Sequence, residues 1–243
     1  MNVPGRYFRD AKPAFLRLLD PRGLRVLDLG CGGGHNGEML KRAGAREVVG
    51  IERDPEAAAD ARGRLDRVIE CDLAELDPAE LGEQPFDAIL ASDVLEHLYD
   101  PETVLARAVA RLRPGGVVVL SLPNVANVYV IAMLLAKTWP RRASGIFDRT
   151  HVRWFARRDM VRLLQDAGLK VLRVEPYFTR YRAIRAAALV LSLYVFRDYW
   201  ARQFLLLGEK PGRPAAESRA AAPETVATGA AATTKAGATE GTS

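Results

Sequence analysis

The sequence predicts an α/β fold in which helices cover both faces of a doubly wound, mostly parallel sheet. Short apolar runs alternate with amphipathic stretches through most of the chain. A dense glycine turn follows the first apolar run, residues 25–29, and acidic residues end several of the later runs. Parallel strands joined by right-handed crossovers place such strand ends along one edge of the sheet, where ligands bind.

The first two strands indicate a nucleoside site. Residues 25–29 lead into Gly30-Cys31-Gly32-Gly33-Gly34, where glycine permits positive φ and a close approach of a ligand to the main chain. Residues 47–51 form the second strand, and Glu52 at its end is placed to accept ribose hydroxyls. The spacing of Gly32, Gly34 and Gly37 also fits a dinucleotide pattern, but Asp28 would crowd a pyrophosphate and suits a cationic ligand.

The other elements follow from apolar periodicity and from helix start and stop signals. Asp54-Pro55 and Asp100-Pro101 each pair an N-cap with a proline in the first turn, and Gly44 and Gly168 end helices. We therefore expect helices at 7–19, 36–43, 55–65, 101–112, 157–167 and 184–196, with a helical segment before Trp139. Further strands are expected at 67–70, 86–91, 117–122, 169–175 and 203–209.

Four segments resemble the class I S-adenosylmethionine-dependent methyltransferases. Residues 28–34, Asp-Leu-Gly-Cys-Gly-Gly-Gly, resemble motif I of that family, and residues 92–98, Ser-Asp-Val-Leu-Glu-His-Leu, resemble its motif after the fourth strand. Ser-Leu-Pro-Asn at 121–124 and Asp-Arg-Thr-His-Val-Arg-Trp-Phe at 148–155 are similar to a subgroup acting on small metabolites, quinone precursors or surface glycans. The resemblance implies a seven-stranded sheet of order 3-2-1-4-5-7-6 with an antiparallel last strand.

The resemblance also implies S-adenosyl-L-methionine as cofactor and a set of residues that bind it. The glycines would pass beneath the cofactor, Asp28 would lie near its amino-acid end, Glu52 would bind the ribose and Asp72 the adenine. The full set is Asp28, Gly30, Cys31, Gly32, Gly34, Glu52, Arg53, Cys71, Asp72, Leu73, Ser92 and Asp93.

The acceptor side is expected to contain two histidines at strand-end positions. Methyl transfer to an alcohol or phenol requires proton removal, and a neutral imidazole suits this near pH 7. We predict His151 as the base and His97 as a residue that shapes the site, although each could instead be a structural imidazole. Asn124, Asp148 and Arg153 are predicted substrate contacts. Two distant cysteines and scattered histidines predict no metal site.

Composition and charge limit which partners and which cellular compartment the protein can have. Residues 47–102 contain seventeen acidic residues and four arginines, whereas residues 137–185 contain thirteen basic and four acidic residues. The basic half could attract an anionic acceptor or membrane surface, or be an ordinary solvated surface. No nucleic-acid motif is visible, no apolar stretch reaches the ~20 residues that span a bilayer, and two cysteines fit a reducing cytoplasm.

One methyltransferase domain is therefore expected at residues 1–210, with substrate-side inserts at 123–156 and 177–200 and a disordered Ala/Thr-rich tail at 211–243. The expected activity is methyl transfer to a small-molecule, glycan or lipid-linked acceptor at oxygen. Two alternatives stay open: a non-catalytic cofactor-binding module that docks a partner, and an NAD(P)-dependent oxidoreductase. A homodimer and a peripheral membrane contact through residues 184–196 also stay open.

Overall fold

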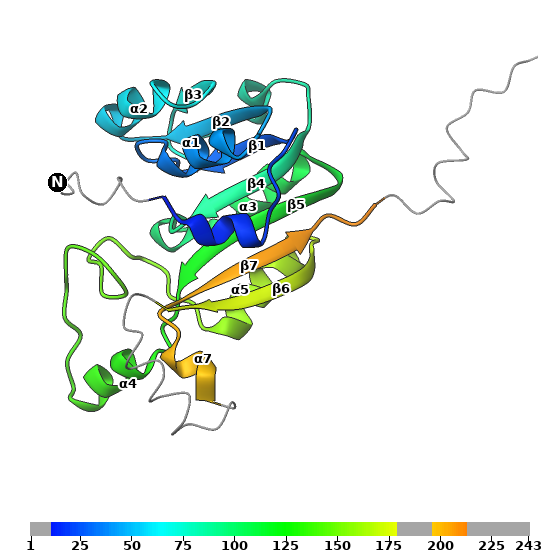
Figure 1. Ribbon diagram of the computed structural model, residues 1–243. Helices are drawn as coiled ribbons and strands as arrows, with labels where there is room; N and C mark the ends of the chain where they lie inside the picture. The colour runs from blue at the N-terminus through cyan, green and yellow to red at the C-terminus, as the bar shows by residue number, and fades with distance from the viewer. Residues whose placement is uncertain (1–10, 179–195, 213–243) are drawn as a thin grey trace, which may run out of the picture. The chain divides into compact units, whose positions relative to one another are not determined.

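The computed structural model describes residues 11–178 and 196–212, and a seven-stranded sheet of order β3-β2-β1-β4-β5-β7-β6 forms its centre (Figure 1). The strands are β1 (Arg25–Leu29), β2 (Glu47–Glu52), β3 (Arg67–Glu70), β4 (Phe86–Ser92), β5 (Leu112–Pro123), β6 (Lys170–Tyr177) and β7 (Gln203–Glu209). The first five pair in parallel, and β7 lies between β5 and β6, antiparallel to both. The predicted fold class and strand order are confirmed.

Helices and short 3₁₀ turns connect the strands. The α-helices are α1 (His35–Arg42), α2 (Pro55–Arg62), α3 (Pro101–Ala110), α4 (Val128–Leu135), α5 (Arg157–Asp166) and α7 (Arg197–Trp200), and the 3₁₀ helices are η1 (Pro13–Arg17), η2 (Pro78–Leu81) and η3 (Leu95–His97). Both predicted N-caps are present: Asp54 accepts the backbone N–H of Ala57, and Asp100 accepts that of Thr103.

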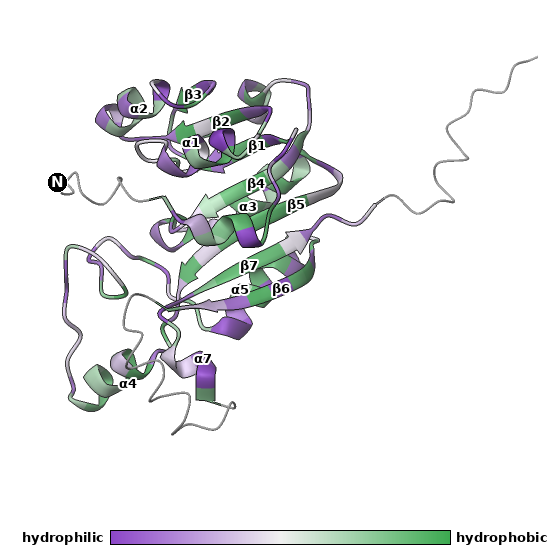
Figure 2. Ribbon diagram, in the orientation of Figure 1, coloured by the Kyte–Doolittle hydropathy of each residue, from purple (hydrophilic) through white to green (hydrophobic). Residues whose placement is uncertain are grey.

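Alternation along the strands builds a core on each face of the sheet. On β1, Leu27 and Leu29 pack with residues of α3 and α5, whereas Val26 packs with residues of η1, α1 and α2. Figure 2 shows the strands coloured mainly as hydrophobic, as sheets buried on both faces are. A third, small cluster lies under α4 and consists of Val130, Ile146 and Phe147.

Several expected boundaries shift for local reasons. The helix expected at 7–19 is, within the described residues, only the 3₁₀ helix η1, and Pro13 begins it instead of interrupting it. β5 begins at Leu112, five residues earlier than expected, because Leu112 pairs with Phe86 before a register shift. The expected helix 184–196 falls almost wholly on residues 179–195, outside the described residues, as does the tail from residue 213.

No helix within residues 11–178 and 196–212 combines the length and the hydropathy that crossing a bilayer would need.

Candidate active site

A cavity of about 420 Å³ opens at the carboxyl ends of β1 and β4, where the strand-end rule places ligands. Its walls come from segments far apart in the chain: Lys12, Gly30, Cys31, Gly32, His35, Asn36, Ser92, Asp93, Glu96, Pro123, Gly145, Ile146, His151, Arg202 and Gln203. The glycine turn and the residue pair at the end of β4 therefore share one cavity with His151.

The glycine turn forms a bare main-chain wall. Gly30 has φ of +63°, and a Cβ there would lie 2.4 Å from Cγ2 of Val94, so no other residue fits this position without displacement. Gly34 has φ of +81° and begins α1, where a Cβ would lie 3.1 Å from the Cα of Ala61. The turn is therefore fixed by both its backbone angles and its packing.

Two buried carboxylates lie close to this turn, and one of them hydrogen-bonds to it. Glu52 accepts the backbone N–H of Gly32 at 2.8 Å and that of Asp54 at 2.9 Å. Asp28 is 1% exposed, and neither of its oxygens has a hydrogen-bond partner among the described residues. Burial, and to a lesser extent the charge of Glu52, raise the pKa of Asp28 to about 8. Neither carboxylate lines the cavity itself.

These features fit a cationic nucleoside cofactor. A buried carboxylate without a partner is costly, and a positive charge on the other side of the turn would compensate it. The bare turn leaves room for close contact with the main chain. Cys31, beside the turn, is no nucleophile, since burial and the two nearby carboxylates raise the pKa of its thiol. The residues present therefore agree with S-adenosylmethionine in this position.

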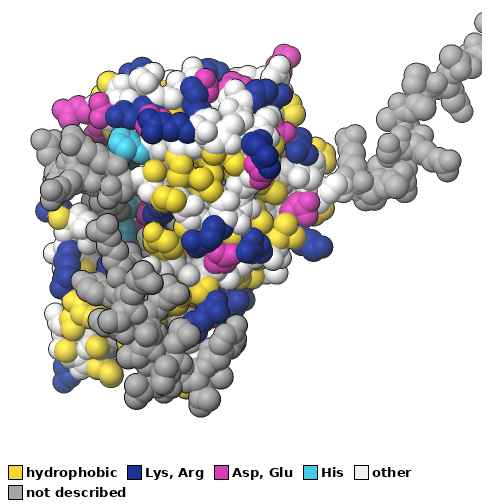
Figure 3. Space-filling model, viewed as in Figure 1, with side chains coloured by type: hydrophobic (Ala, Val, Ile, Leu, Met, Phe, Trp, Pro, Cys, Tyr) yellow, Lys and Arg dark blue, Asp and Glu magenta, His cyan; other side chains and the backbone are white. Residues whose placement is uncertain are grey.

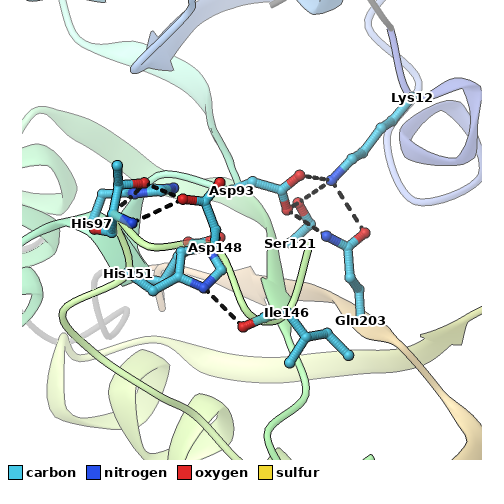
Figure 4. A network of polar contacts seen from close by, with 10 residues as sticks. Lys12, Asp93, His97, Ser121, Ile146, Asp148, His151 and Gln203 are labelled. Carbon is cyan, nitrogen blue, oxygen red and sulfur yellow. Dashed lines mark hydrogen bonds and ion pairs between the residues drawn. The ribbon is translucent and has the colours of Figure 1, made fainter. Parts of the chain in front are cut away.

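A polar network forms another part of the wall (Figure 4). Asp93 accepts the hydroxyl of Ser121 at 2.7 Å and the amide of Gln203 at 2.9 Å, and it pairs with the ammonium of Lys12. The same ammonium lies 2.9 Å from Oγ of Ser121. Asp93 has φ of +51°, which is uncommon for a residue other than glycine. The network holds the strained end of β4 against β5, β7 and the N-terminal segment.

On the acceptor side, His151 lies with His97 and Glu96. Nδ1 of His151 lies 3.2 Å from the carbonyl of Ile146, and since a carbonyl only accepts, Nδ1 carries the proton. Nε2 is then the basic nitrogen, and it lies 3.9 Å from Oε1 of Glu96. The two imidazole rings meet edge to face, with centroids 4.8 Å apart.

Burial shifts the pKa values of the two histidines and of Glu96 in opposite directions. Burial lowers the pKa of His151 below its usual range, and the charge of nearby Asp148 offsets this only in part. Burial and the charge of His151 likewise lower the pKa of His97. Burial raises the pKa of Glu96 well above its usual range, with Asp93 adding to the effect. Neutral imidazoles beside a carboxylic acid are suited to moving a proton near pH 7.

Glu96, His97 and His151 are also the described residues whose ligand atoms lie closest to a metal-binding arrangement, within 4.8 Å of one another. The sequence did not predict this juxtaposition. Ligands about 2.1 Å from a tetrahedral ion lie about 3.4 Å apart, so the group would have to contract to hold one. We therefore interpret it as a proton-transfer group.

The predicted substrate contacts lie outside the cavity wall. Asn124 is buried, and its amide donates to the carbonyls of Asp198 and Ala201 at 2.9 and 3.0 Å. Arg153 donates to the carbonyl of Tyr99 at 3.0 and 2.5 Å.

Asp148 also supports the site from behind. It accepts the hydroxyl of Thr150 at 2.6 Å, and that oxygen lies 3.0 Å from Nδ1 of His97. Asp148 thus helps to position the loop that carries His151 and, through Thr150, also His97 on η3.

Four predicted cofactor residues lie at the ends of β2 and β3, away from this cavity. Arg53 pairs with Asp72 at 3.4 Å on the surface, and Asp72 also accepts the backbone N–H of Ala74. Cys71 is half-buried, and Leu73 belongs to the core. Their contact with an adenine remains a prediction.

Sequence reasoning gave no role to Lys12, Gln203 and Arg202. Glu96 and Ser121 stand in motifs that were recognised, but they were not among the predicted site residues. Lys12 contacts Asp93, which is 81 residues away in the sequence, and Gln203, which is 191 residues away. No local sequence pattern predicts contacts between residues so far apart.

Comparisons with known proteins agree with this geometry. Residues 5–174 match the family model described as a methyltransferase domain. An uncharacterized 37.1 kDa protein of transposon TN4556 from Streptomyces fradiae is 31% identical over 76% of this chain and 55% of its own length. The ubiquinone biosynthesis O-methyltransferase of Xanthomonas axonopodis pv. citri is 31% identical over 68% of this chain and 72% of its own. The chain thus spans between about half and three quarters of the length of these relatives.

Among solved structures, an S-adenosylmethionine-dependent methyltransferase from Mesorhizobium loti superposes with a TM-score of 0.59 at 21% identity, covering 81% of this chain and 96% of that one. This likeness shows a common fold. The family model, which covers more than half of the chain, and the O-methyltransferase relative show that the chain belongs to the class I S-adenosylmethionine-dependent methyltransferase family.

Proposed function

We propose that the protein transfers the methyl group of S-adenosylmethionine to a hydroxyl oxygen of a small-molecule, glycan or lipid-linked acceptor. The observation that carries this proposal is that the glycine turn and His151 line the same cavity. One wall suits the cofactor and the other offers a base, so donor and acceptor would meet between them. The similarity to an O-methyltransferase of ubiquinone biosynthesis supports oxygen as the target atom.

The residues of the chain then divide the work. The sulfonium of the bound cofactor supplies an electrophilic methyl group, which needs alignment and a deprotonated acceptor. Nε2 of His151 takes the acceptor proton, while the carbonyl of Ile146 fixes its tautomer. The Asp148–Thr150–His97 contacts hold the second imidazole beside it.

Two measurements test the proposal. Calorimetry with S-adenosylhomocysteine should show binding to a single site, and incubation with labelled S-adenosylmethionine and a metabolite extract should label a small molecule. Binding without any labelled product from any extract would favour the alternative, a cofactor-binding module that docks a partner. The absence of binding would reject both. Membership of the methyltransferase family removes the oxidoreductase alternative.

The sequence favours a cytoplasmic location and leaves a homodimer open. Size-exclusion chromatography with light scattering tests the dimer, and cell fractionation tests the location.

A further inference from the structure

The helix α4 and the loop after it carry several exposed apolar side chains. One face of α4 packs on the small core through Val130 and Met133. Leu134 and Leu135 project away from it and are 55% and 79% exposed. Figure 2 shows α4 coloured mainly as hydrophobic, and Figure 1 shows it beyond the end of β5, apart from the sheet. An exposed helix of this kind marks an interaction surface.

Aromatic side chains extend this surface in a continuous chain of ring contacts. Tyr129 meets Phe147 at 5.7 Å, Phe147 meets Trp139 at 4.9 Å, and Trp139 meets Trp154 at 5.9 Å between ring centroids. Tyr129, Trp139 and Trp154 are all exposed. Tryptophan and tyrosine with one wet side are the residues that membrane–water interfaces favour.

The exposed charge of the same segment is one-sided. Between residues 123 and 154 the one acidic residue is Asp148, which is buried, whereas Lys137, Arg141 and Arg142 follow α4 in the loop. All three basic residues are exposed, and Arg142 lies against Tyr129, to whose hydroxyl it donates at 2.8 Å. Figure 3 shows basic and hydrophobic side chains side by side in the region where α4 lies. An apolar surface with a basic rim complements a bilayer that carries anionic headgroups.

We propose that α4 and the loop to Trp154, called here the α4 surface, dock the protein on an anionic lipid bilayer. A second copy of the chain fits less well, because a two-fold contact would bring two copies of the same positively charged surface together. The α4 surface is also continuous with the cavity. Ile146 packs under α4 and lines the cavity wall, so docking would bring the cavity mouth near the lipid. The proposal does not depend on methyl transfer.

Vesicle flotation of the full chain tests the proposal. We expect it to float with vesicles of equal parts phosphatidylcholine and phosphatidylglycerol, to float weakly with phosphatidylcholine alone, and to be released as salt is raised. The double variant Leu134→Asp, Leu135→Asp should lower partitioning about tenfold or more. Charge reversal of Lys137, Arg141 and Arg142 should abolish the difference between the two vesicle types. Leu172→Asp, at a comparably exposed leucine (42%) on β6, is the matched control and should change nothing.

Three outcomes would overturn it: no binding to anionic vesicles, binding that the double leucine variant leaves unchanged, or an equal loss in the Leu172→Asp control. Light scattering on the same variants detects the competing occupant, since a dimer that dissociates on Leu134→Asp, Leu135→Asp would show that a second copy covers the α4 surface. Unchanged binding of S-adenosylhomocysteine by each variant shows that the fold is intact and keeps this test separate from the proposed activity.

Discussion

The two walls of the cavity are built differently. The cofactor wall is main chain at the ends of β1 and β4, held by Glu52 and by packing at Gly30. The acceptor wall is made of side chains from two segments, Glu96 on η3 and His151 on the loop between β5 and α5, and hydrogen bonds such as those of Asn124 and Asp148 hold this region in place. The cofactor wall is set by the local sequence and tolerates almost no substitution. The acceptor wall depends on contacts between distant segments, so substitutions there can change the acceptor while the cofactor stays the same.

The largest effect should come from the cofactor wall. Gly30→Ala places a Cβ 2.4 Å from Val94 at a backbone angle that alanine rarely adopts. We expect loss of measurable S-adenosylhomocysteine binding and a lower melting temperature. Gly63→Ala is the matched control, since Gly63 has φ of −76° and its Cβ would lie 3.5 Å from the nearest atom. Calorimetry showing normal binding by Gly30→Ala would mean that the turn is not the cofactor wall.

The next largest effect should come from a substitution in the acceptor wall, which should lower the rate of methyl transfer without changing cofactor binding. His151→Gln should lower kcat by about 10²- to 10⁴-fold, the usual contribution of a general base, with cofactor binding unchanged. The lowered pKa of His151 places the acid limb of the wild-type rate profile below pH 6.5, since the imidazole must be neutral to accept a proton. Single-turnover rates with the identified acceptor measure this. An unaltered rate in His151→Gln would leave the histidine a structural role only.

The contrast between the walls also explains what the sequence could predict. β7 has its expected bounds because an unbroken apolar run, residues 204–207, stands at its centre. The strand order followed from the family resemblance that the motifs carry. The glycine turn and Glu52 could be predicted because they lie in one short stretch of sequence, directly after two apolar strands. Asn124 was read as a substrate contact because it follows a strand, whereas its amide is used up by Asp198 and Ala201. Lys12 carried no signal, because its partners are brought to it only by the completed sheet.

A third prediction concerns Asp28, whose pKa of about 8 makes cofactor binding depend on pH. A cationic ligand favours the ionised carboxylate, so affinity should rise with pH up to about pH 8, by as much as about tenfold per unit, and then level off. Asp28→Asn should flatten this rise, whereas Asp20→Asn, at an exposed ion pair, should not. Calorimetry with S-adenosylmethionine between pH 6 and 9 measures it.

The same residue predicts a stability change without cofactor. The unfolded chain loses the Asp28 proton near pH 3.8 and the folded protein only near pH 8, so the folded state holds more protons in between. Asp28 should therefore lower stability progressively as pH rises through that window. A wild-type protein and an Asp28→Asn variant with parallel stability profiles from pH 4 to 8 would contradict the buried, unpartnered carboxylate.

A fourth prediction separates support from binding on the acceptor wall. Asn124→Ala leaves the Asp198 and Ala201 carbonyls without this donor, at a cost of about 1–3 kcal/mol. A loss of 1 kcal/mol lowers the melting temperature by about 2–4 °C in a domain of this size. Gln165→Ala, at an exposed position of α5, should be neutral. A raised KM with unchanged melting temperature would restore Asn124 as a substrate contact.

The smallest effect should come from the surface pair Arg53–Asp72, which lies beyond the described cavity. Its atoms are 3.4 Å apart, and the arginine side chain is 65% exposed. Exposed pairs contribute about 0–1 kcal/mol, so Arg53→Gln should shift the melting temperature only slightly. The informative measurement is therefore affinity. If S-adenosylhomocysteine binds Asp72→Ala much more weakly but Arg53→Gln normally, the adenine extends to the end of β3, and the cofactor wall continues past the cavity. If both variants bind normally, the cofactor wall ends at the glycine turn, and the predicted adenine contact at Asp72 is wrong.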